Sequence, residues 1–107
     1  MARPKYKPRR WVDPRFKEKI RKRDGVCIAG MLMDRTSEKL ADGRYTWECS
    51  GELDAHHITS RGAGGGDNLA NGILLCRRHH TMAHMNDIPR YMLYRWLFFL
   101  YGEKYGN

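Results

Sequence analysis

The sequence predicts a small single domain of the α+β class. A chain of 107 residues has room for one compact core. Residues 53–85 read as a strand, a glycine-rich loop, a second strand and a helix in succession. Further helices are expected on either side, at 14–24 and 88–101. Because so short a chain buries little apolar surface, we expect a structural metal or oligomerisation to contribute to its stability.

The first 12 residues are expected to form a flexible basic arm, with the folded domain at 13–107. Residues 1–23 hold 11 of the 20 basic residues and carry a net charge of +9, whereas the whole chain carries +8. A basic arm on a near-neutral body favours a nucleic-acid partner over the alternative of a solubilising tail. The residues expected to contact nucleic acid are Arg3, Lys5, Lys7, Arg9, Arg10, Lys17, Arg21 and Lys22.

The elements before the central unit are a helix and a hairpin. Asp13 suits the cap of a helix at 14–24, Pro14 its first position and Gly25 its end. Residues 26–52 are interpreted as a hairpin, because the Asp42-Gly43 pair is a strong turn signal between Leu40 and a Tyr-Thr-Trp run.

The central unit and the last helix follow. Strands are expected at 53–58 and 72–75, separated by a loop at 59–70, and a helix at 77–85. The helix at 88–101 should end at Gly102 and is apolar almost all round, which is typical of a buried helix. The alternative is that one face of this helix joins two copies, so the protein is expected to be a monomer or a homodimer.

No membrane partner is expected, since no apolar run approaches the roughly 20 residues that span a bilayer. The first residues are basic but no apolar run follows them, so no secretory signal is recognised. A cytoplasmic location is therefore expected, where cysteines are more often metal ligands or core residues than disulfides.

Five histidines lie within residues 56–84, and their spacing indicates an open metal site. His80 and His84 are four apart on the predicted helix and project from one face. His56 and His57 are neighbours on a strand and point to opposite faces. His56, His80 and His84 would thus hold a metal with positions left open, as catalytic sites do.

A second donor set consists of Cys27, Cys49, Cys76 and His79, which suits a closed tetrahedral zinc site. Cys76 and His79 are three apart at the start of a helix, whereas Cys27 and Cys49 bracket the predicted hairpin. No CxxC pair is present, so unrelated buried or free thiols remain the alternative.

The run from Leu53 to His84 resembles the HNH endonucleases, whose core is the ββα-metal fold. The motif reads His56-His57-Ile58, then Gly65-Gly66-Asp67, Asn71, Leu75-Cys76 and His79-His80. The pattern looks like the small single-domain proteins of phages and bacteria, and the histidine triad is similar to that of colicin nuclease domains. The insertion between Cys27 and Cys49 and the missing CxxC depart from the zinc knuckle of many members.

The resemblance implies a role for each matching residue. His57 matches the general base, and His56, His80 and His84 match the metal ligands. Asn71 matches the motif's asparagine, which braces the loop by hydrogen bonds. Arg61, just past the first strand, is a candidate phosphate clamp, with an ordinary exposed loop arginine as the alternative.

The implied activity is metal-dependent hydrolysis of DNA by nicking or double-strand cleavage, leaving 5′-phosphate and 3′-hydroxyl ends. Imidazole ligands favour zinc, nickel, cobalt or manganese, whereas many HNH members use magnesium or manganese, so the divalent ion stays unassigned. Phage packaging proteins are a candidate partner, since phage members often act beside a terminase. The alternative function is a non-catalytic, zinc-stabilised DNA-binding module.

Overall fold

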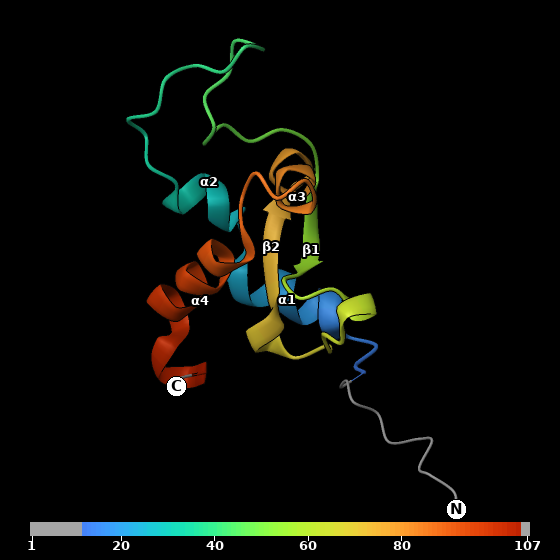
Figure 1. Ribbon diagram of the computed structural model, residues 1–107. Helices are drawn as coiled ribbons and strands as arrows, with labels where there is room; N and C mark the ends of the chain where they lie inside the picture. Colours follow the sequence, from blue (N-terminus) through green and yellow to red (C-terminus); the bar gives the residue numbers. More distant parts are fainter. Residues whose placement is uncertain (1–11, 106–107) are drawn as a thin grey trace, which may run out of the picture.

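The computed structural model describes residues 12–105 and shows an α+β fold (Figure 1). Eleven of the twelve residues in the predicted arm at 1–12 lie outside the described residues, and they include the arm's five expected nucleic-acid contacts. The elements are α1 (Phe16–Asp24), α2 (Ile28–Leu32), β1 (Leu53–His57), η1 (Arg61–Ala63), η2 (Leu69–Asn71), β2 (Gly72–Cys76), α3 (Arg77–His84) and α4 (Arg90–Tyr105).

The centre of the fold is the ββα unit that the sequence predicted. Strands β1 and β2 pair antiparallel, with Leu53 opposite Cys76 and His57 opposite Gly72. Helix α3 begins directly after β2, because the Cys76 side chain caps it by accepting from the backbone N–H of His79. In Figure 1, α3 lies at the end of the sheet where β1 begins and β2 ends.

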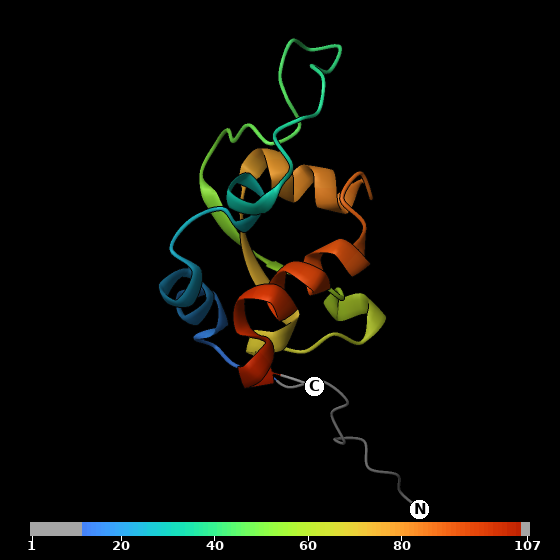
Figure 2. The same cartoon turned by 90° about the vertical axis from the view of Figure 1, so that its left-hand side faces the viewer.

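Strand β2 is buried along its whole length and separates two apolar clusters. Ile73 and Leu75 pack with residues of α2 and α4, whereas Leu74 packs with Phe16 and Ile20 of α1. This alternation follows from the two-residue period of a strand. Figure 2 shows α1 and α4 on opposite sides of the sheet, so β2 forms the middle of the core.

The hairpin prediction for residues 26–52 is wrong. This segment contains the short helix α2 and no strand. The predicted turn is present, since Gly43 donates to the Leu40 carbonyl and Leu40 donates to the Arg44 carbonyl at 2.7 Å. No ladder extends from it, and in both views the segment projects from the body beyond α2 (Figures 1 and 2).

Helix α1 begins at Phe16, two residues later than predicted, and Arg15 rather than Asp13 is its N-cap, because a turn at residues 14–15 precedes the helix. Asp13 still anchors this turn, since its carboxylate accepts from the Arg15 N–H at 2.9 Å and its carbonyl from the Phe16 N–H at 3.0 Å. At the other end, Gly25 takes a left-handed φ of 73° and closes the helix as predicted.

Helix α4 differs from its prediction in two ways. It passes Gly102 and ends at Tyr105, although Tyr101 breaks its regular geometry (φ −131°, ψ 20°). Leu93 and Leu97 are buried, but Phe98 and Phe99 are 67% and 74% exposed, so this helix is buried on one face only. Pairing of two copies through the exposed face stays a prediction.

A buried polar group joins α1, β2 and α4. The Asp24 carboxylate accepts from the Leu74 N–H at 2.9 Å, from the Tyr101 hydroxyl at 2.8 Å and from the Arg23 guanidinium at 2.7 Å. Burial and the neighbouring Asp24 carboxylate raise the pKa of Tyr101 to about 12.

The described part of the chain holds no helix of the length and apolar character that a membrane span requires.

Candidate active site and metal clusters

Strand β1 directs its two histidines to opposite sides, as its two-residue period requires. His56 is 7% exposed, and its ring centroid lies 5.0 Å from that of His80 and 5.2 Å from that of His84. One nitrogen of each ring lies within 4.8 Å of one nitrogen of the other two. The structure therefore brings together the three histidines that the spacing predicted as metal ligands.

His56, His80 and His84 form the three-histidine cluster, and the electrostatics of this cluster suit metal binding. Burial, together with positive charge on the neighbouring His80 and His84, lowers the pKa of His56 to about 4. His56 is then a neutral imidazole at neutral pH, with a nitrogen lone pair to donate. Three imidazole nitrogens at these separations fit a divalent transition metal.

His57 lies on the other side of β1 and is held by two contacts. Its ring stacks on Phe16 with centroids 4.3 Å apart, and its Nε2 lies 2.8 Å from Oδ1 of Asp67. A carboxylate accepts hydrogen bonds, so Nε2 carries the proton and Nδ1 keeps the lone pair. His57 is thereby fixed in one orientation and one tautomer, with 19% of its side chain exposed.

Asp67 is the residue of this site whose role the sequence analysis missed. Its side chain is only 6% exposed, and it also accepts from Arg61 at 2.7 Å and from the Asp13 N–H at 2.8 Å. Burial alone would raise the pKa of Asp67, but these three donors hold it below its usual value. The motif includes Asp67, yet its contacts depend on a loop path that local sequence does not predict.

Asn71 lies where it braces the loop between the strands, which is the geometry expected of the motif's asparagine. Its side-chain oxygen accepts from the Thr59 N–H at 2.8 Å, and its Nδ2 donates to the carbonyls of Thr59 and Gly66, each at 3.0 Å. A Cβ at Gly65 would lie 1.8 Å from the Thr59 carbonyl oxygen, so only glycine permits this close approach. The brace positions the segment that contributes Arg61 and Asp67.

One hollow of about 620 Å³ is lined both by the three-histidine cluster and by His57. Its lining comes from α1, β1, α3 and the loop between the strands. The charged and histidine residues that line it are Asp13, Lys17, His56, His57, Arg61, Asp67, His80 and His84. The donor set for a metal and the histidine held by Asp67 are therefore accessible to the same bound molecule.

The predicted nucleic-acid contacts within the described residues lie on α1. Lys17 lines the hollow, and Lys17 and Arg21 also line an adjoining groove with Arg77, His80 and His84. Lys22 is exposed on the same helix but lines neither. The basic side of α1 thus borders the three-histidine cluster.

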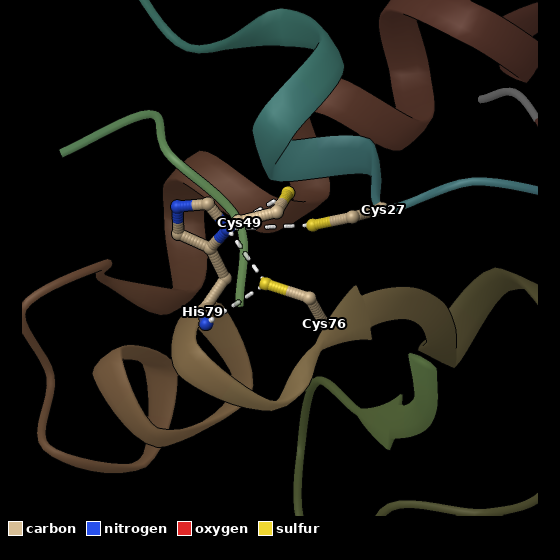
Figure 3. A group of neighbouring side chains, drawn as sticks. All are labelled: Cys27, Cys49, Cys76 and His79. Atoms are coloured by element: carbon tan, nitrogen blue, oxygen red, sulfur yellow. Dashed lines mark hydrogen bonds between the residues drawn. The ribbon is translucent and has the colours of Figure 1, made fainter. Parts of the chain in front are cut away.

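A second group of donors, the Cys3His cluster, consists of Cys27, Cys49, Cys76 and His79 (Figure 3). Nδ1 of His79 lies 3.4, 3.8 and 3.2 Å from the sulfur atoms of Cys27, Cys49 and Cys76. Cys27 caps α2 and Cys76 caps α3, whereas Cys49 comes from the segment before β1. The structure therefore brings together all four residues of the predicted closed set.

The surroundings of the Cys3His cluster orient His79 toward the sulfur atoms and act differently on the three thiols. His79 donates from Nε2 to the Thr46 carbonyl at 2.6 Å, so its Nδ1 lone pair faces the sulfur atoms. Burial raises the pKa of Cys27, and burial with neighbouring thiols raises that of Cys49 to about 12. Burial opposes ionisation of Cys76 as well, yet backbone N–H donors from His79 and Ser50 lower its pKa.

Arg78 holds the segment that completes the Cys3His cluster, which sequence reasoning also missed. Its guanidinium donates to the carbonyls of Tyr45, Thr46 and Glu48 at 3.0, 3.3 and 2.5 Å. These carbonyls are therefore occupied by a side chain from α3 rather than by a partner strand. The same contacts present the Thr46 carbonyl to His79 and bring Cys49 to the other ligands.

Comparison with protein families agrees with this geometry. The family model described as HNH endonuclease matches residues 42–86. The comparisons with curated proteins and with solved structures gave no match. The resemblance to the HNH endonucleases is thus confirmed over residues 42–86, which include every residue of the two clusters except Cys27, together with His57, Arg61 and Asn71.

Proposed function

We propose that this protein is a metal-dependent HNH endonuclease that hydrolyses phosphodiester bonds of DNA. One observation carries the proposal: the three-histidine cluster and His57 with its Asp67 partner line the same hollow. Phosphodiester hydrolysis needs a base to activate water and positive charge to stabilise the phosphate. This hollow offers residues for both tasks.

His57 acts as the general base. Because its Nε2–H is donated to Asp67, the basic nitrogen is Nδ1, which removes a proton from the attacking water. Stacking on Phe16 and the bond to Asp67 keep the ring from rotating. A base that is oriented in advance loses less entropy when the substrate binds, and general-base action contributes roughly 10²–10⁴-fold to the rate.

Arg61 contacts the phosphate that is cleaved. Its side chain is 45% exposed and lines the hollow while it pairs with Asp67. A guanidinium can donate to a carboxylate and to a phosphate oxygen at the same time, because it carries five N–H groups in a fixed plane. Arg61 thereby holds the phosphate close to the water that His57 activates.

His56, His80 and His84 would hold the catalytic divalent ion, which when bound supplies Lewis-acid stabilisation of charge on the phosphate and the departing 3′ oxygen. Hydrolysis then leaves a 5′-phosphate and a 3′-hydroxyl. Lys17 and Arg21 on the bordering side of α1 contact the DNA backbone on the approach to the site. Such contacts position the duplex without selecting its sequence.

The decisive experiment is cleavage of supercoiled plasmid by the His57→Ala variant across Mg²⁺, Mn²⁺, Zn²⁺, Ni²⁺ and Co²⁺. We expect the parent to nick or linearise the plasmid with at least one ion and to stop when a chelator is added. The variant should be slower by at least about 10²-fold, since it lacks the base. Its circular dichroism spectrum and metal content should match those of the parent.

Glu38→Ala, at an exposed position that lines neither the hollow nor the adjoining groove, is the control and should cleave at the parental rate. Cleavage by His57→Ala at a rate close to that of the parent would refute the role of His57. DNA binding without cleavage under every ion would instead favour the non-catalytic, zinc-stabilised DNA-binding module.

A further inference from the structure

We propose that Asp54 is a positioning residue that fixes the orientation and tautomer of His80 for metal binding. The inference rests on the proposed function, because it assigns a role toward the ion that His56, His80 and His84 would hold. Asp54 does not itself belong to the three donors that converge. Its role is to act through His80.

Strand geometry places Asp54 beside the three-histidine cluster. Asp54 lies two residues before His56 on β1, so both side chains point to the same face of the strand. That face meets α3, where Oδ2 of Asp54 lies 3.1 Å from Nδ1 of His80. The Asp54 side chain is 21% exposed, so the contact is partly shielded from water.

The contact determines which nitrogen of His80 is available as a ligand. A carboxylate only accepts hydrogen bonds, so Nδ1 of His80 must carry the proton. Nε2 then holds the lone pair, and it lies 3.1 Å from Nε2 of His84, on the side where the donors converge. Asp54 thus makes His80 a ligand through Nε2 before any ion arrives.

Arg77 fixes the carboxylate in turn. Its Nε donates to Oδ2 of Asp54 at 2.6 Å and its Nη2 to Oδ1 at 3.4 Å. Two donors from one rigid guanidinium restrict rotation of the carboxylate, which keeps Oδ2 directed at His80. Arg77 therefore orients Asp54, and Asp54 in turn orients His80.

The test is a Co²⁺ titration of the full chain with the parent and three variants. Bound at the Cys3His cluster, Co²⁺ gives a thiolate-to-metal absorption band, whereas an imidazole site gives none, so calorimetry and absorbance together separate the two sites. We expect Asp54→Ala to weaken binding at the imidazole site by about 10–100-fold and to leave the thiolate band unchanged. Arg77→Gln should weaken Co²⁺ binding at the imidazole site less than Asp54→Ala does, because the contact between Asp54 and His80 remains.

A spectroscopic readout makes the role distinct from a purely structural one. In ¹⁵N-correlated spectra without added metal, His80 of the parent should be protonated at Nδ1, and Asp54→Ala should shift that proton toward Nε2. Glu38→Gln, an exposed acidic position outside both clusters, is the matched control for removing one negative charge. The retained thiolate band shows that each variant is folded.

The outcomes separate this inference from the proposed function. A parent that binds a single Co²⁺, with the thiolate band, overturns the proposed function and this inference with it. A parent that binds two ions, with an Asp54→Ala variant of equal affinity and unchanged His80 tautomer, overturns the inference alone. Weaker binding with the tautomer shift supports it.

Discussion

The Cys3His cluster and the three-histidine cluster share helix α3 but differ in how they are completed. The first has four donors, with Cys27, Cys76 and His79 buried and backbone N–H groups directed at the sulfur atoms. The second has three donors, one of them exposed, and it borders a hollow. A closed set of four is typical of a structural metal, and an open set of three of a catalytic one.

The two regions also differ in what holds their surroundings together. Around the Cys3His cluster, α2, the 45–49 segment and α3 converge at the four donors, and Arg78 of α3 holds the carbonyls of the 45–49 segment. Around His57, the loop between the strands is held by neutral and charged hydrogen bonds through Asn71 and Asp67. We therefore expect the first region to depend on an ion for stability and the second to keep its fold without one.

The largest expected effect comes from Cys76→Ala. Cys76 is 1% exposed, contributes a sulfur to the closed set and caps α3. Apparent metal-binding free energies of about 10–16 kcal/mol are measured for structural zinc in small domains, and global stability is only about 5–15 kcal/mol. The variant should lose most of its cooperative thermal unfolding, as monitored by circular dichroism.

A chelator that is strong enough to remove zinc should have the same effect on the parent. If Cys76→Ala instead unfolded within a few degrees of the parent, the Cys3His cluster would not be a structural site. That result would return its cysteines to the alternative of unrelated buried thiols.

Asn71→Ala comes next and affects the other region. The change removes the partners of the Thr59 N–H and of the carbonyls of Thr59 and Gly66. Buried groups left without partners cost about 1–3 kcal/mol each, and partial access of water reduces the sum, so we expect a loss of about 1–3 kcal/mol in urea unfolding. Metal content at the Cys3His cluster should not change.

Asn68→Ala is the matched control, because Asn68 is exposed and its side chain makes no capping bond to η2. This variant should unfold with the parent. An Asn71→Ala variant as stable as Asn68→Ala would show that the loop does not depend on the brace.

Gly30→Ala sharpens the comparison at the Cys3His cluster. The added Cβ would lie 2.4 Å from the sulfur of Cys49, so that sulfur must move away from the other ligands. Such overpacking costs about 1–3 kcal/mol, whereas alanine gains about 1 kcal/mol of helix propensity over glycine in α2. We expect a net loss of about 1 kcal/mol in thermal unfolding and weaker zinc binding in a competition assay.

Gly62→Ala serves as the control, since nothing lies within 4 Å of a Cβ at that position. Its zinc affinity should equal that of the parent. Unchanged zinc affinity in Gly30→Ala would indicate that Cys49 does not bind the ion.

Local sequence predicted the ββα unit closely, and the reason is physical. Alternation, glycine positions and histidine spacing are short-range signals, and β1, β2 and α3 depend on them. The predicted hairpin failed because Tyr45, Thr46 and Glu48 give their carbonyls to Arg78, about 30 residues later. The local sequence pattern does not predict such a long-range contact.

The candidate site shows the same division. The convergence of His56, His80 and His84 was predicted because their spacing along a strand and a helix determines which side chains meet. The carboxylates that orient the histidines, Asp54 and Asp67, were not assigned roles. Asp54 shares a strand face with His56 and could have been found from the two-residue period, whereas the position of Asp67 depends on the path of the loop.

His84→Ala should have the smallest effect on stability and a large effect on metal binding. His84 is exposed near the end of α3, and substitutions at such positions usually change the free energy of unfolding by less than about 0.5 kcal/mol. It nevertheless contributes one of three donors to the open set, so the variant should lose the second Co²⁺ and the cleavage of plasmid while keeping the thiolate band and the melting temperature. A His84→Ala variant that unfolded as readily as Cys76→Ala would mean that the open cluster also holds the fold together, and the distinction between a structural and a catalytic site would not apply to this protein.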